Sequence, residues 1–220
     1  METEDKSLEQ KTTSKRRLLP VLLWGVLVFV IAAIVAANIK SFMHRPSEKS
    51  VSESPLSRLS ENHQLPDFSL TDQNGGALSL ADLEGKVWVA DFIFTSCPTI
   101  CPPMTDELRR LQDEFAAESE LRFVSFSVDP ERDTPAVLSR YAQSFGADHR
   151  RWSFLTGEKS SIYQLAHDGF NLAVGHQGSE ILHSTRFVLV DRQGTVRGYY
   201  DSRIKANLRH LRRDIKTLLG

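Results

Sequence analysis

The sequence predicts an α/β domain that follows a single N-terminal membrane-spanning helix. From Gln64 to the end of the 220-residue chain, apolar side chains recur alternately with periods of two and of 3.6 residues. A period of two is typical of a strand and a period of 3.6 of a helix, so this region predicts strands interleaved with helices. Before it, the stretch from Leu18 to Ala37 is apolar and carries no charge.

The elements of the domain follow from these periods. Strands are expected at residues 87–94, 121–128, 151–155, 185–190 and 195–200. Amphipathic helices are expected around residues 104–115, 135–145 and 208–218. Thr134 is expected to cap the second of these helices, with Pro135 at its first position. The run from Asp191 to Gly194 is expected to form a hairpin turn.

The N-terminal part divides into three segments. The twenty residues from Leu18 to Ala37 would form a helix about 30 Å long, which is enough to span the hydrocarbon layer. We expect a cytoplasmic tail over residues 1–17, a transmembrane anchor over 18–39, a flexible tether over 40–63 and the folded domain over 64–220. A cleaved secretory signal is the alternative, although the apolar part of a signal is usually shorter, about 7–15 residues.

Basic residues set the expected orientation of this anchor. Lys15, Arg16 and Arg17 directly precede it, whereas basic residues are more widely spaced after it. This bias favours a cytoplasmic N-terminus and an extracytoplasmic domain. The N-terminus is not an Arg-rich, acid-poor presequence, which favours a single-pass protein of a bacterial inner (cytoplasmic) membrane with its C-terminal domain in the periplasm.

Charge and cysteine content narrow the function. The formal net charge is −1, with acids and bases interspersed, so no basic surface for binding nucleic acid is expected. The two cysteines, Cys97 and Cys101, are four residues apart and cannot cross-link distant parts of the fold. We therefore expect them to act locally.

The cysteines lie in a proline-rich loop between the most apolar strand and the first amphipathic helix. Ligands of open α/β sheets usually bind at the carboxyl ends of strands. Pro102 and Pro103 suit a first helical turn, so the helix is expected to begin just after Cys101. A helix N-terminus favours thiolate over thiol. Two buried cysteines or an inert local disulfide would be the alternative without function.

Two thiolates are soft ligands suited to Cu(I) or zinc, and an imidazole would add a third donor. The chain has seven histidines, and most are expected in or beside the tether or facing water. His176 and His183 remain as candidate ligands. His183 immediately precedes the strand expected at residues 185–190. It can approach the cysteines only if this strand lies beside the strand that leads to them.

Three motifs resemble the Sco/SenC family of copper chaperones. They are FTSCPTICP at residues 94–102, SVDPERDTP at residues 127–135, and HSTRFVLVDRQG at residues 183–194. The likeness covers roughly residues 64–220. The combination of CPxxCP with a later HS before a strand is specific, whereas CxxxC alone would be a weak signal.

This resemblance implies a thioredoxin-like fold, a central mixed sheet flanked by helices, and copper bound by Cys97, Cys101 and His183. It implies that the protein delivers copper to, or prepares the thiols of, the dinuclear copper site in subunit II of cytochrome c oxidase. It leaves open whether the copper is Cu(I) or Cu(II). Leu182 occupies a position that is acidic in many family members, so a partner for the histidine's other nitrogen must come from elsewhere or be absent.

A redox role is the closest alternative. Asp91 interrupts the apolar strand six residues before Cys97, where thioredoxins have a buried aspartate that assists proton transfer, so it resembles a proton acceptor. The cysteines would then form a disulfide when oxidised and depend on a thioredoxin-like reductant. Against this, the CxxxC spacing and Ser184, where reductases usually have a cis-proline, favour metal binding.

The same residues are compatible with other roles. The alternative for Asp91 is that it faces water or holds a loop. A redox-gated signalling module without copper delivery is a further alternative, and a thiol peroxidase fits the motif less well. The charged run from Asp129 to Pro135 is expected to be a turn without chemistry. We expect a metallochaperone rather than an enzyme.

Overall fold

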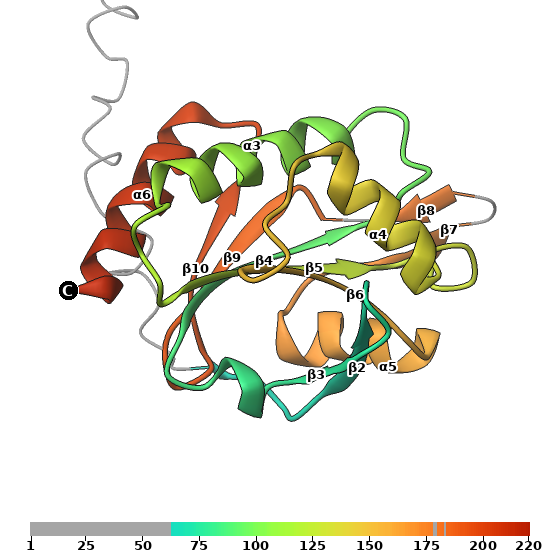
Figure 1. Ribbon diagram of the computed structural model, residues 1–220. Coiled ribbons are helices and arrows are strands. Elements are labelled where there is room, and N and C mark those ends of the chain that lie inside the picture. The colour runs from blue at the N-terminus through green and yellow to red at the C-terminus, as the bar shows by residue number, and fades with distance from the viewer. Residues whose placement is uncertain (1–62, 178–179, 183) are drawn as a thin grey trace, which may run out of the picture. The chain divides into compact units, whose positions relative to one another are not determined.

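The computed structural model describes residues 63–177, 180–182 and 184–220 (Figure 1). The predicted tail and anchor, and the predicted tether up to residue 62, lie outside these residues, as does His183. Within the described part of the chain, no helix is long and apolar enough to cross a membrane.

The centre of the structure is a mixed sheet of eight strands in the order β1-β10-β9-β4-β5-β6-β2-β3. The three strands β4, β5 and β6 are parallel, and all the other pairings are antiparallel. The strands are β1 (His63–Gln64), β2 (Ser69–Asp72), β3 (Ala77–Ser79), β4 (Val87–Ile93), β5 (Leu121–Ser127), β6 (Trp152–Thr156), β9 (Arg186–Val190) and β10 (Thr195–Asp201). A separate hairpin pairs β7 (Gly175–Gln177) with β8 (Glu180–Leu182).

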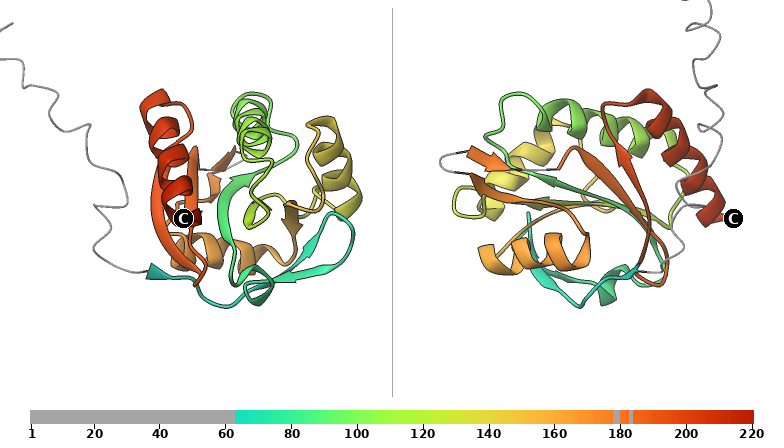
Figure 2. Two further views of the ribbon diagram at one scale, coloured as in Figure 1. Left: turned by 60° about the vertical axis from the view of Figure 1, so that its left-hand side comes forward. Right: turned by 180° about the vertical axis from the view of Figure 1, so that it is seen from behind.

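Helices cover both faces of this sheet. Helices α3 (Cys101–Glu114), α4 (Pro135–Ser144) and α6 (Lys205–Leu219) lie side by side on one face (Figures 1 and 2). The other face is covered by α5 (Lys159–Gln164), which continues into the π-helical segment η2 (Leu165–Gly169). The 3-10 helix η1 (Ala81–Leu83) precedes β4. This arrangement confirms the α/β sandwich expected from the sequence.

Alternating side chains of the strands form two hydrophobic clusters. In β4, Val87, Val89 and Ile93 face the cluster under α3, α4 and α6. Trp88, Ala90 and Phe92 face the cluster under α5 and η2. A strand that is apolar on both faces must be covered on both faces, so β4 takes a central position.

The expected strands and helices are present, with ends shifted by up to three residues. Helix α4 begins at Pro135, with Thr134 extended at the N-cap position, but the Thr134 side chain makes no capping hydrogen bond. The turn at Asp191 is also present, and its carboxylate accepts the N–H groups of Gln193 and Thr195, each at 3.0 Å.

Several short elements were not expected from the sequence: β1, β2, β3, α5, η2 and the β7–β8 hairpin. The strands among them are two to four residues long, too short for a period to stand out.

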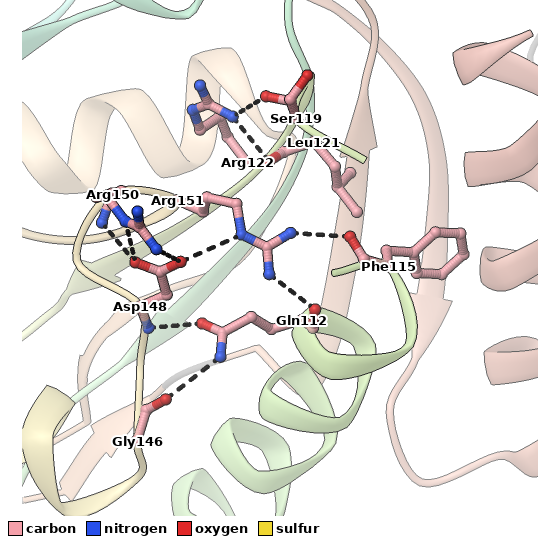
Figure 3. Close-up of polar contacts among 9 residues, drawn as sticks. All are labelled: Gln112, Phe115, Ser119, Leu121, Arg122, Gly146, Asp148, Arg150 and Arg151. Atoms are coloured by element: carbon pink, nitrogen blue, oxygen red, sulfur yellow. Dashed lines mark hydrogen bonds and ion pairs between the residues drawn. The ribbon is translucent and has the colours of Figure 1, made fainter. Parts of the chain in front are cut away.

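The C-terminal end of α3 is held by Arg151 (Figure 3). Its guanidinium donates to the carbonyl oxygens of Gln112 and Phe115, each at 2.8 Å. A cation suits the negative end of a helix dipole. The Gln112 side chain in turn accepts the Asp148 N–H at 2.7 Å and donates to the Gly146 carbonyl at 3.3 Å. These bonds fix α3 against the chain between α4 and β6.

A buried hydrogen bond joins β10 to α6, and its loss should destabilise the domain. The hydroxyl of Tyr200 donates to Asp214 at 2.8 Å, and both side chains are buried. We expect Tyr200→Phe to lower the unfolding free energy by about 1–3 kcal/mol, because a buried carboxylate loses a donor. Urea denaturation measures this loss. Tyr199→Phe is the matched control, since Tyr199 is only half-buried on the opposite face, and an equal loss there would contradict the assignment.

Candidate metal centre

Strand β4 leads directly into the loop that carries the cysteines. The loop spans residues 94–100, between the end of β4 and the first residue of α3. Its first turn is closed by the Cys97 N–H, which donates to the Phe94 carbonyl at 3.1 Å. Helix α3 begins at Cys101 itself, with Pro102 in its first turn, one residue earlier than the expected start. Pro102 therefore does not exclude Cys101 from the helix.

The two cysteine side chains lie together at the N-terminus of α3. The backbone N–H of Cys101 donates to Sγ of Cys97 at 3.3 Å. Cys97 is 6% exposed and Cys101 is fully buried. They are thiols in this structure rather than a disulfide.

The surroundings give the two thiols different pKa values, lower for Cys97 than for Cys101. Burial raises the pKa of Cys97, but the N–H groups of Cys101, Thr99 and Ile100 together outweigh it, so its pKa lies below the ordinary value. Burial raises the pKa of Cys101 far above the ordinary value, and the nearby Cys97 and Asp91 raise it further. Cys97 is thus the thiol poised to act as nucleophile or ligand at neutral pH.

Asp91 is fully buried in β4, so the alternative that it faces water is wrong. It pairs in register with Ser125 of β5 and shares the α3 side of β4 with Val89 and Ile93. Neither carboxylate oxygen has a hydrogen-bond partner among the described residues. Burial raises the pKa of Asp91 to about 7, and the nearby Ser125 hydroxyl offsets only part of this effect. Asp91 therefore titrates near neutrality.

A chain of hydroxyl groups adjoins the cysteines, and the sequence did not indicate it. The hydroxyl of Thr105 donates to the Cys101 carbonyl at 3.0 Å. It also lies 2.8 Å from the hydroxyl of Tyr141 in α4. Burial raises the pKa of Tyr141, and the nearby charges of Cys101, Asp91 and Cys97 raise it further, so Tyr141 stays a neutral donor.

The position of His183 itself lies outside the described residues, but the strand after it is well placed. Strand β9 pairs antiparallel with β4, with Val188 opposite Ala90 and Val190 opposite Trp88. The start of β9 therefore lies toward the end of β4 that leads to Cys97. In Figure 1 the β7–β8 hairpin and the loop before α3 lie at the same end of the sheet. The requirement that these two strands be neighbours is met.

Among the residues that the structure describes, no group of three or more His, Cys, Asp or Glu side chains could hold a metal ion. The described part of the site thus supplies two soft sulfur donors, and a third donor would have to come from elsewhere. A mixed sheet flanked by helices, with a cysteine pair between a central strand and the next helix, defines a thioredoxin-like domain with a CxxxC site.

Comparison with known proteins gives the family. Residues 57–220 match the SCO1/SenC family model, so the chain belongs to this family. The SCO1 protein homolog of Bacillus subtilis is 41% identical over 139 residues, which are 61% of this chain and 72% of the relative.

Two solved structures show the same fold. BsSco, a member of the Sco family of cytochrome c oxidase assembly proteins in which a disulfide switch was identified, has a TM-score of 0.65 at 37% identity, covering 72% of this chain and 94% of its own. Copper-bound ScoI from Bradyrhizobium japonicum has a TM-score of 0.56 at 27% identity, covering 70% and 99% of the two chains. The thioredoxin-like fold of the domain is confirmed.

The two thiols should differ in reactivity. We expect iodoacetamide at pH 7.5 to alkylate Cys97 faster than Cys101 by about tenfold or more, because each pKa unit changes the thiolate fraction about tenfold. Mass spectrometry of the reduced, metal-free protein measures both rates. Cys101→Ala and Cys97→Ala isolate each thiol, and faster reaction of Cys101 would contradict the assignment.

Asp91 should make stability depend on pH. Its pKa is raised to about 7 in the folded state from 3.8, so the folded state holds a proton that the unfolded state has lost between these values. Stability from this group is full below about pH 4 and is lost as pH rises toward 7. Relative to wild type, Asp91→Asn should gain up to a few kcal/mol over this range, since one pKa unit is worth about 1.4 kcal/mol.

Urea denaturation of the reduced, metal-free proteins at pH 4.5, 6 and 7.5 measures this difference. An Asp91→Asn variant whose stability runs parallel to wild type at all three pH values would show that Asp91 does not titrate in this range.

Proposed function

We propose that this domain binds copper through Cys97, Cys101 and His183 and delivers it to the copper-bearing subunit II of cytochrome c oxidase. The observation that carries the proposal is the placement of two thiols at the N-terminus of α3, with the Cys101 N–H 3.3 Å from Cys97 Sγ. Membership in the SCO1/SenC family and the copper-bound structure of a relative support it.

The donor set suits a soft metal. Helix N–H groups stabilise the Cys97 thiolate, and copper would replace the proton that burial otherwise keeps on Cys101. An imidazole from His183 would complete a three-donor site of the kind that suits Cu(I). A partner that offers its own soft ligands could take the metal by stepwise exchange, because three protein donors leave room for an incoming one.

The same proposal includes an anchor. Residues 18–39 would hold the protein in the inner membrane as a single-pass helix, with the domain on the periplasmic side. The apolar length of this segment and the basic residues before it support this.

Copper stoichiometry tests the proposal. Under reducing conditions, the purified full-length chain should bind one equivalent of copper. Cys97→Ala, Cys101→Ala and His183→Ala should each weaken binding by about 10-fold or more, because each removes a direct ligand. Competition with a chelator of known copper affinity measures the loss. His176→Ala is the matched control and should bind like wild type.

A second candidate function is reduction of a partner's disulfide, which the unequal thiols favour. The Cys97 thiolate would attack the partner disulfide, and Cys101 would then close the intramolecular bond as it loses its proton. Two electrons pass to the partner, whose two sulfurs leave as thiols after taking up two protons from the solvent. Asp91, which titrates near neutrality, would accept the Cys101 proton. A thioredoxin-like reductant would restore the pair.

The His183→Ala variant separates the two functions. Copper delivery requires the histidine, whereas disulfide reduction requires only the two cysteines. If His183→Ala binds copper like wild type and still reduces a model disulfide, the reductase function replaces the chaperone function. In that case Asp91→Asn should slow thiol exchange in a pH-dependent way.

A further inference from the structure

A buried carboxylate outside the cysteine loop accepts hydrogen bonds from the start of that loop. Asp133, in the turn between β5 and α4, is fully buried. Its carboxylate accepts the backbone N–H of Thr95 at 3.1 Å and the Thr95 hydroxyl at 2.5 Å. It also accepts the hydroxyl of Ser127, at the end of β5, at 2.5 Å. One side chain therefore binds together the ends of two neighbouring strands.

The turn around Asp133 is itself fixed, so the carboxylate has little freedom. The N–H groups of Arg132 and Asp133 both donate to the Asp129 carbonyl, at 3.0 and 2.9 Å. The Asp129 N–H donates to the hydroxyl of Ser127 at 3.1 Å. Arg132 pairs with Asp129 rather than with Asp133. Among the described residues, Asp133 thus has three neutral donors and no ion pair.

These contacts lie two residues from the first cysteine. Because Asp133 accepts both the N–H and the hydroxyl of Thr95, it holds the backbone in place within the turn from Phe94 to Cys97. That turn places Cys97 Sγ where the Cys101 N–H can reach it. Among the described residues, Asp133 has no hydrogen bond to either thiol, and its direct contact with the cysteine loop is through Thr95.

We propose that Asp133 is a positioning residue for the copper site, which holds the cysteine loop so that Cys97 Sγ stays over the N–H groups at the start of α3. The proposal rests on the proposed copper function for its metal readout. It extends to the metal-free protein, in which the same loop geometry places Cys97 Sγ 3.3 Å from the Cys101 backbone nitrogen. Groups that orient metal ligands in this way typically contribute 10–100-fold to metal affinity.

Substitutions at Asp133 distinguish positioning from simple structural support. In Asp133→Asn, the amide oxygen can still accept from the Thr95 N–H and from Ser127, while the amide nitrogen donates to the Thr95 hydroxyl. Asp133→Ala loses all three bonds. The expected order of effect is therefore Ala greater than Asn. Asp191→Ala is the matched control, because this buried carboxylate also accepts three bonds, from Gln193, Thr195 and Arg197.

Two measurements make the test. In the full-length reduced protein, Asp133→Ala should weaken Cu(I) binding by about 10–100-fold in a chelator competition. In the metal-free protein, the pH midpoint of Cys97 alkylation should shift upward, since the thiolate loses its donors. Asp133→Asn should fall between this variant and wild type. Asp191→Ala should lower the melting temperature but leave both readouts unchanged.

Each outcome supports or overturns the positioning role of Asp133. A folded Asp133→Ala with wild-type copper affinity and an unshifted midpoint would overturn the proposal, as would an equal effect of Asp191→Ala. If Asp133→Ala does not fold, Thr95→Val, which loses only the hydroxyl contact, takes its place with the same two criteria. If wild type binds no copper, the proposed function fails, and the alkylation midpoint alone still decides the role of Asp133.

Discussion

Burial of strand β4 on both faces is the constraint on which the rest of the structure depends. All seven of its residues, from Val87 to Ile93, are fully buried. Such a strand needs a neighbour on each side and a layer of helices above and below, and the sheet and the two hydrophobic clusters supply them. Because β4 cannot move, the chain leaves it at a fixed point. The cysteine loop starts from that point.

A buried carboxylate that lacks a hydrogen-bond partner among the described residues adjoins the thiols. Asp91 puts a carboxylate without a hydrogen-bond partner among the described residues into the middle of this strand. An apolar residue there would be more stable, since burying an unpartnered polar group is costly. Asp133 is equally buried but fully bonded. The two aspartates therefore contribute differently: Asp133 stabilises geometry, and Asp91 brings a titratable proton close to Cys101.

The sequence could predict what depends on periodicity. The long strands, the three large helices and the cysteine loop between β4 and α3 all follow from regular spacing of apolar residues, and the motifs identified the family. Contacts between distant segments could not be read in this way. The hydrogen bonds between Asp133 and Thr95 join residues 38 positions apart and depend on the pairing of β4 with β5, so the charged run near Asp133 predicts only a turn. The short edge strands left too few residues for a period, and the roles of Cys97, Cys101 and His183 as ligands stay predictions.

The way the chain enters the domain has a consequence for access. Strand β1 pairs with the first residues of β10, and Gly85, just before β4, donates to the Arg192 carbonyl at 2.9 Å. All of these residues lie at the end of the sheet where β4 starts, whereas the thiols lie at the opposite end, where β4 ends. With a rise of about 3.3 Å per residue, β4 alone separates the two ends by roughly 20 Å. The first described residues, in β1, therefore lie at the opposite end of the sheet from the thiols and do not cover them.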